Sequence, residues 1–169
     1  FKDPKVFKKN GQLCAILGAQ TDTEFGRLLL YSSKDIVNWH FEGEIKTQLT
    51  EFGYMWECPD YFEIDRHDVI LFCPQGIQAE NERYRNIYQS GYMIGHLDIE
   101  NMIFDHQSFQ ELDDGFDFYA PQTFTDKNGK RILIGWMGLP EMNYPTDSEG
   151  WAHCLTTVSY THLTLPTKR

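Results

Sequence analysis

The chain has 169 residues, 41% of them hydrophobic and 24% charged, so it can bury a core, and extensive disorder is not expected. Its formal net charge of −10 argues against nucleic acid or an anionic membrane surface as a partner, because both bind basic faces. Aromatic residues make up 15% and favour strands and stacking surfaces over a helical bundle.

Short β-rich runs separated by turn residues dominate the chain, and helical periodicity is scarce. Asn10-Gly11 and Asn128-Gly129 predict hairpin turns, because Asn and Gly both tolerate positive φ. The polar segment 79–86 is predicted to be a loop between strands. In chain order, the predicted strands are 12–18, 27–32, 61–64, 69–73, 92–98, 122–125 and 131–137.

The strands form a threefold repeat that begins at Pro4, Pro59 and Pro121. Each proline is followed by a short strand, a tight turn and a hydrophobic strand, and we expect it at the first residue of its strand, where no ladder donor is needed. About four strands in roughly 50 residues is the size of a β-propeller blade, whose first strand lines the central channel. A β-sandwich gives similar strands but does not require this period. The sequence therefore predicts an all-β fold with about three propeller blades in an incomplete ring.

An acidic residue stands shortly before each of these prolines: Asp3, Glu57 and Asp117. Because the repeat puts them near the starts of equivalent strands, we expect a cluster of carboxylates around a small polar ligand. Glycoside cleavage needs such a cluster, with one carboxylic acid to protonate the leaving oxygen and another carboxylate to attack or stabilise the cationic sugar.

Five segments resemble motifs of glycoside hydrolase family 32, the family of invertases, levanases, inulinases and sucrose-6-phosphate hydrolases, and they occur in the family's order. The first three are Phe1-Lys2-Asp3-Pro4-Lys5, similar to its Arg-Asp-Pro motif, Trp56-Glu57-Cys58-Pro59-Asp60, similar to its Glu-Cys-Pro motif, and Asp117-Phe118-Tyr119-Ala120-Pro121-Gln122, similar to its Asp-x-Tyr-Ala-Pro-Gln segment. The last two are Gly135-Trp136-Met137 and the segment 150–156.

The resemblance implies a five-bladed propeller and a retaining β-fructofuranosidase, which cleaves a terminal β-fructofuranoside such as sucrose, sucrose 6-phosphate or a fructan. It implies that Glu57 is the general acid/base and that Asp3 binds fructose hydroxyls and stabilises the transition state. The implied substrate-binding residues are Lys2, Trp56, Asp117, Tyr119 and Trp136. Neither a cofactor nor a metal is expected, and the expected partner is a small carbohydrate.

The sequence departs from the family pattern in three places. The Asn-Asp-Pro motif that carries the family's nucleophilic Asp does not occur in the chain, so we expect an internal piece of a catalytic domain that is inactive by itself. Lys2 stands where the family has Arg and lacks its planar, bidentate fork. Residues 1–156 are predicted to form the partial propeller, and 157–169 an atypical tail that is either an artefact of the sequence or an ordinary strand.

Two other interpretations remain open. A related five-bladed hydrolase of arabinose or xylose polymers would also spread acids over its blades, but such relatives lack the Trp-Glu-Cys-Pro-Asp string. A noncatalytic carbohydrate-binding module would present an aromatic platform in place of an acid cluster. The scattered cysteines fit a reducing compartment and favour a bacterial cytoplasmic location, since they form no CxxC pair: Cys14, Cys58, Cys73 and Cys154.

Overall fold

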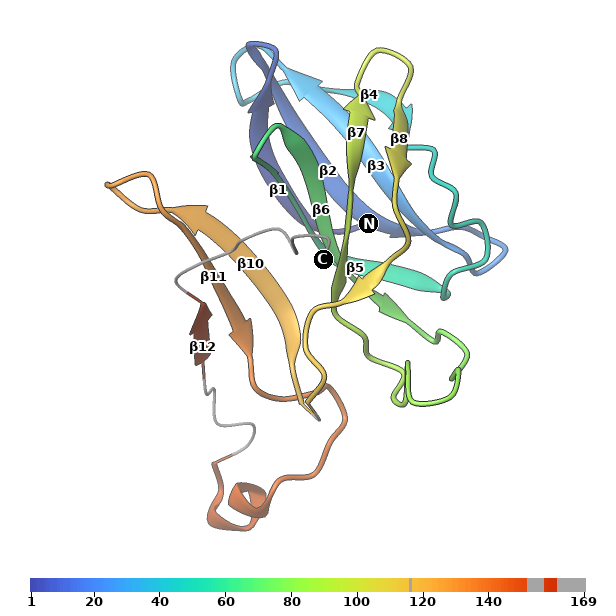
Figure 1. Cartoon of the computed structure of the whole chain (residues 1–169), viewed down its shortest axis with the longest axis vertical. Coiled ribbons are helices and arrows are strands. Elements are labelled where there is room, and N and C mark those ends of the chain that lie inside the picture. The colour runs from blue at the N-terminus through green and yellow to red at the C-terminus, as the bar shows by residue number, and fades with distance from the viewer. Residues whose placement is uncertain (116, 152–156, 161–169) are drawn as a thin grey trace.

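Strand pairing divides the chain into three antiparallel sheets, whose colours run in chain order from blue to red in Figure 1. The structure, a computed structural model, describes residues 1–115, 117–151 and 157–160. The first sheet has the order β1 (Lys2–Lys9), β2 (Gln12–Gln20), β3 (Gly26–Ser33) and β4 (Trp39–Glu44). The second has the order β5 (Met55–Ile64), β6 (His67–Gln75), β7 (Gly91–Asp98) and β8 (Ile103–His106), and β9 (Gln110–Glu111) also pairs with β7.

The third sheet has the order β10 (Tyr119–Thr125), β11 (Arg131–Trp136) and β12 (Thr157–Tyr160), and a short 3-10 helix, η1 (Pro145–Glu149), lies between β11 and β12 in the chain. The predicted all-β fold with three blade-like units is confirmed. Within the described ranges, no helix has the length and apolar character needed to span a membrane. Of the predicted tail, the backbone of 157–160 forms β12, and 161–169 lies outside the described residues, as do 152–156 of the fifth motif.

The sequence pattern does not predict β4 or β8, the two outer strands. β4 is largely exposed, so its residues lack the apolar alternation that marks a half-buried strand. β8 is only four residues long and buries only Phe104. The predicted loop 79–86 contains no strand, which agrees with the sequence prediction.

The positions of the prolines correct a sequence prediction. Pro4, Pro59 and Pro121 lie inside β1, β5 and β10, not at the first residue of these strands. In each strand the register with its neighbour shifts at the proline. Such a bulge leaves a residue outside the ladder, so the missing N–H of proline costs no strand hydrogen bond.

The residue before each proline adopts the same uncommon backbone conformation. Asp3, Cys58 and Ala120 have φ angles of 55°, 49° and 51°. A residue before proline normally prefers an extended backbone, and a non-glycine residue in the left-handed region carries strain. Strain of this kind persists where the surrounding structure holds it in place, which occurs preferentially at functional sites. The fold therefore repeats one strained bulge in the first strand of all three blades.

The two larger apolar cores of the described residues join the blades. Between the first and second blades, the ring of Trp56 lies 4.6 Å from that of Phe72 and is 1% exposed. A Cβ on Gly26 would come within 2.1 Å of the indole, so glycine makes this packing possible. The second core gathers side chains from β5, β6, β7 and β11 with Phe118: Phe62, Val69, Leu71, Ile94, Phe118 and Leu133. Sheets packed face to face in this way bury their central strands on both sides.

A buried ion-pair network also ties the first blade to the second. Lys9 is 8% exposed, and its Nζ donates hydrogen bonds to Asp68 Oδ1 at 2.7 Å, Tyr61 Oη at 2.8 Å and Glu63 Oε1 at 3.0 Å. Asp68 Oδ2 accepts a further bond from the Leu97 N–H at 2.6 Å. Each partner of the buried charge pair is thus also hydrogen-bonded, the condition under which such pairs are tolerated.

This network predicts that the chain loses stability in acid. Burial by itself raises the pKa of Asp68, but the bonds from Leu97 N–H, Lys9 and Tyr61 outweigh it and bring the pKa below the ordinary 3.8. The carboxylate therefore contributes stability above pH 3.8, and this contribution disappears as the pH falls below that value, through the lowered pKa. Urea unfolding in neutral and acidic buffer should give a smaller acid-induced loss for Asp68→Asn than for the unchanged chain. Equal losses in the two proteins would contradict the assignment.

Candidate active site

Three side chains meet where the first strands of the blades converge. Lys2, Glu57 and Tyr119 each stand two residues before the proline of their strand. Lys2 Nζ pairs with Glu57 Oε1, and the Tyr119 hydroxyl donates a hydrogen bond to Glu57 Oε2 at 2.9 Å. Glu57 is 9% exposed, so its carboxyl group is held in a nearly buried position by one residue from each neighbouring blade.

The charge and proton positions around Glu57 follow from these contacts. The hydrogen bond and charge of Glu57 raise the pKa of Lys2, against a smaller effect of burial, so Lys2 stays cationic. Burial raises the pKa of Tyr119, which keeps its hydroxyl protonated. Gln75 Nε2 donates to the Tyr119 oxygen at 3.2 Å, so the tyrosine proton points to Glu57. The sequence analysis did not single out Gln75, which lies at the end of β6 in no recognised motif.

Asp3 lies against the residue that follows Glu57. Its Oδ2 accepts a hydrogen bond from the Cys58 N–H at 3.0 Å and lies 3.6 Å from Cys58 Sγ. A hydrogen bond with Cys73 and burial both raise the pKa of the Cys58 thiol. A protonated thiol is a poor nucleophile, so Cys58 is suited to packing and not to covalent chemistry. The structure thus brings Asp3 together with the strand segment that carries Glu57.

The two tryptophans lie in different surroundings. Trp56 points away from Glu57 into the core between the blades, where its Nε1 donates to the Phe52 carbonyl at 2.6 Å. Successive residues of a strand face opposite sides, so Trp56 supports the strand and does not line the space around the carboxyl group. Trp136 lies opposite Tyr119 in the pairing of β10 with β11, and both residues belong to one small apolar cluster. The geometry therefore favours Trp136 over Trp56 as a wall of the site; their roles in binding stay predictions.

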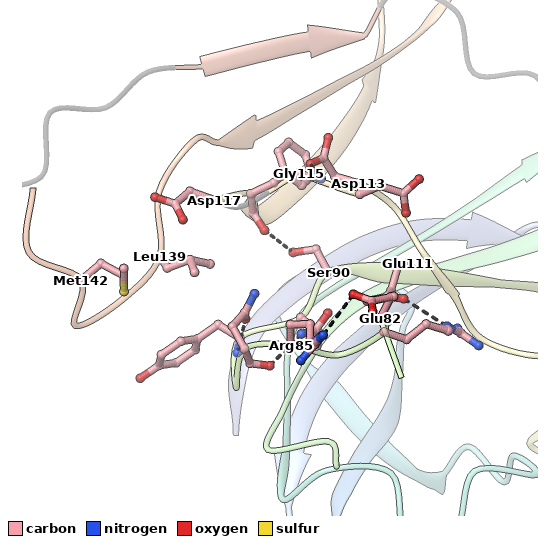
Figure 2. Close-up of a pocket in the computed structure, with 15 residues that line it drawn as sticks. Glu82, Arg85, Ser90, Glu111, Asp113, Gly115, Asp117, Leu139 and Met142 are labelled. Carbon is pink, nitrogen blue, oxygen red and sulfur yellow. Dashed lines mark hydrogen bonds and ion pairs between the residues drawn. The ribbon is translucent and has the colours of Figure 1, made fainter. Parts of the chain in front are cut away.

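Asp117 lines a separate cavity of about 740 Å³ (Figure 2). Its Oδ2 accepts a hydrogen bond from the Tyr144 hydroxyl at 2.9 Å. Tyr88 also lines the cavity, and its ring meets that of Tyr119 edge-on at 5.5 Å between centroids. The Tyr88–Tyr119 pair thus connects the cavity to the side chain that contacts Glu57. Tyr88 lies just after the loop 79–86, and its sequence context favours a packing role over sugar stacking.

The cavity lining is rich in acids. Its five carboxylates outnumber its two guanidinium groups: Glu82, Glu111, Asp113, Asp114 and Asp117 against Arg83 and Arg85. Arg83 pairs with Glu111 at 3.1 Å and Arg85 with Glu82 at 3.0 Å. Carboxylates accept hydrogen bonds from hydroxyl groups, so the lining suits a neutral, hydroxyl-rich ligand. Among the residues that the structure describes, no group of three or more His, Cys, Asp or Glu side chains could hold a metal ion.

Carboxylate, ammonium and hydroxyl groups converge from the first strands of successive blades. The three blade-like sheets define the class of protein, part of a β-propeller. The chain belongs to glycosyl hydrolase family 32, because the model "Glycosyl hydrolases family 32 N-terminal domain" matches residues 1–168. This confirms the resemblance seen in the motifs. The division of the chain at residue 156 stays a prediction.

The relatives match this chain over a limited part of their length. The sucrose-6-phosphate hydrolase of Staphylococcus xylosus is 62% identical over 156 residues, which are 92% of this chain and 32% of that protein. The chain therefore spans about a third of the length of this relative.

Solved structures of the family have the same fold. The β-fructofuranosidase BmSUC1 of Bombyx mori matches with a TM-score of 0.84 and 42% identity, over 94% of this chain and 33% of that one. A mutant of this enzyme in complex with sucrose matches with a TM-score of 0.82 and 40% identity, over 95% and 33%. The sucrose-6-phosphate hydrolase of Lactobacillus gasseri matches with a TM-score of 0.81 and 37% identity, over 94% and 33%. These matches confirm three blades of a five-bladed propeller.

For the alternative of an arabinan-cleaving hydrolase, the similarity to solved structures is one of fold alone. An α-L-arabinanase of Cellvibrio cellulosa matches with a TM-score of 0.52 and 16% identity, over 80% of this chain and 44% of that one. An identity this low carries no argument about substrate.

Proposed function

We propose that this chain forms part of the catalytic domain of a retaining β-fructofuranosidase in which Glu57 is the general acid/base. The observation that carries the proposal is the nearly buried Glu57 carboxyl group, which Lys2 and Tyr119 contact from the two adjoining blades. Membership of family 32 supports it, as do the names of the relatives, sucrose-6-phosphate hydrolase and β-fructofuranosidase.

In the first step, the Glu57 carboxyl group donates its proton to the oxygen between the two sugars as the bond to the fructose anomeric carbon breaks. A nucleophilic Asp outside this chain takes up the fructosyl group, as the family resemblance implies. The Tyr119 hydroxyl and the Lys2 ammonium then stabilise the Glu57 carboxylate. In the second step this carboxylate removes a proton from water, which releases fructose with retained configuration. Asp3 accepts hydrogen bonds from fructose hydroxyls.

The substrate is sucrose or sucrose 6-phosphate, and the acid-rich cavity beside Tyr119 receives the leaving sugar. Its lining suits a neutral glucosyl group. The names of the bacterial relatives favour the phosphorylated substrate. A phosphate group would be bound through Arg85, whose pair with Glu82 is exposed and so contributes little stability. The bacterial origin of the Staphylococcus xylosus relative supports the predicted cytoplasmic location, as do the free thiols of Cys14, Cys58 and Cys73.

The proposal is tested in a full-length enzyme, obtained by placing residues 1–156 of this chain in the Staphylococcus xylosus relative in place of the matching segment. We expect this chimera to hydrolyse sucrose and sucrose 6-phosphate and the isolated 169-residue chain to hydrolyse neither, because the chain has no Asn-Asp-Pro nucleophile motif. Reducing-sugar release measures both. A folded chimera that binds sucrose without turnover would favour the noncatalytic module. Turnover by the isolated chain would contradict the proposal that the nucleophilic Asp lies outside it.

A further inference from the structure

A second set of polar side chains lies close to Lys2, Glu57 and Tyr119. Like them, it takes one residue from the first strand of each blade. Lys5, Asp60 and Gln122 each follow directly after the proline of their strand. Lys5 Nζ lies 3.2 Å from Asp60 Oδ1 and 3.4 Å from Gln122 Oε1. The three blades are thus joined by two successive layers of side-chain contacts, one before the prolines and one after them.

Gln122 reaches from the third blade to the strained backbone of the second. Its Nε2 donates a hydrogen bond to the carbonyl oxygen of Cys58 at 3.0 Å. Lys5 is a donor only, so it faces the amide oxygen of Gln122, which leaves the amide N–H groups directed at Cys58. The orientation of the Gln122 amide is therefore fixed by its two partners.

Cys58 is consequently held on both sides of its backbone. Its N–H is bound by Asp3 of the first blade, and its C=O by Gln122 of the third. Its φ of 49° lies in the region where a residue before proline is strained. Such a conformation relaxes when the contacts that hold it are removed, and the adjoining Glu57 would turn with it.

We propose that Gln122 is a positioning residue for Glu57, acting through the Cys58 carbonyl group. The inference rests on the proposed function, since it takes Glu57 to be the proton donor. A donor must lie within hydrogen-bond reach of the leaving oxygen, and a displacement of about 1 Å can cost up to about a hundredfold in rate. Gln122 contacts the Cys58 carbonyl group and Lys5, so we expect it to affect catalysis through the position of Glu57, the proton donor of the first step.

The test compares two substrates in the full-length enzyme carrying Gln122→Met, which preserves side-chain length and removes both N–H donors. Sucrose has a poor leaving group and needs the proton, whereas a nitrophenyl β-fructofuranoside leaves as a stable phenolate and needs it little. We expect kcat/KM for sucrose to fall by about tenfold or more and that for the aryl fructoside by less than about threefold. Both values come from one preparation, so a smaller folded fraction lowers them equally and leaves their ratio unchanged.

Gln107→Met is the matched control, because Gln107 is exposed on the second blade, away from the site, and the ratio should stay at its original value. Equal losses on both substrates, or no loss on either, would overturn the positioning role of Gln122. Glu57→Gln in the same assay separates this outcome from a failure of the proposed function. If Glu57→Gln also shows no selective loss on sucrose, Glu57 is not the proton donor and both proposals fail.

Discussion

Replacing Glu57 by Gln is expected to lower kcat/KM for sucrose in the full-length enzyme by about 10²–10⁴-fold, the usual contribution of a general acid. The amide keeps the size of the side chain and can still meet Tyr119, but it has no acidic proton to give to the leaving oxygen. The aryl fructoside should lose far less in kcat/KM, because its first step needs little protonation. Initial rates over a range of concentrations of each substrate provide the measurement.

Glu63→Gln is the control for this substitution. Glu63 lies on the same strand as Glu57, but its side chain is 57% exposed and pairs with Lys9 away from the site. We expect its kcat/KM for sucrose to stay within about twofold of the unchanged enzyme, because the Gln oxygen can still accept a hydrogen bond from Lys9 and the side chain lies away from the site. Near-normal turnover of sucrose by Glu57→Gln would end the acid/base assignment.

Removal of the Asp60 carboxylate is expected to reduce the free energy of unfolding of the 169-residue chain by about 3–5 kcal/mol, the range for breaking a buried ion pair from one side. Asp60 is 0% exposed, lies 3.2 Å from Lys5 Nζ, and accepts a hydrogen bond from the Thr123 N–H at 2.5 Å. Within the described part of the chain its Oδ1 accepts no hydrogen bond of good geometry, so the Lys5 contact acts as an ion pair. Asp60→Ala would thus leave the buried Thr123 N–H without its acceptor and the partly buried Lys5 ammonium group without its counterion.

Urea unfolding followed by tryptophan fluorescence provides this measurement, since Trp56 is 1% exposed in the folded chain. Asp22→Ala is a suitable control, because Asp22 is exposed in a turn and should change stability by less than about 0.5 kcal/mol. Adding Lys5→Met to Asp60→Ala should recover part of the loss, because no unpaired charge then remains. A loss below about 1 kcal/mol for Asp60→Ala would show that the three first strands do not depend on this contact.

The sequence predicts the repeat because its signals are local. Proline marks each first strand, and Asn10-Gly11 and Asn128-Gly129 mark two of the hairpin turns. The predicted place of the prolines was wrong, because a bulge allows a strand to continue through a residue that lacks an N–H. No local sequence pattern predicts such a bulge, because the bulge depends on how the neighbouring strand pairs.

The site residues were predicted from short motifs, and a motif does not show which side chains face each other in the folded chain. Trp56 and Glu57 are adjacent in one motif, yet the pleat of the strand turns the indole into the core and the carboxyl group to Tyr119. Gln75 lies in no motif, and Gln122 ends the third motif without an assigned role, because a glutamine gains a role only from its partners in the folded chain. Asp60 lies within the motif, but only its burial shows that it links three strands.

The sequence by itself determined the family, the β-rich blades and the acidic residues before the prolines, since each depends on short runs of residues. Only the tertiary structure decided which side chains meet: Lys2 with Glu57, Glu57 with Tyr119, and Gln122 with the Cys58 carbonyl group. These partners are 55 to 64 residues apart and come together only when the bulged first strands pack side by side. The position of the Glu57 carboxyl group is therefore a property of three packed blades and not of the motif that contains it.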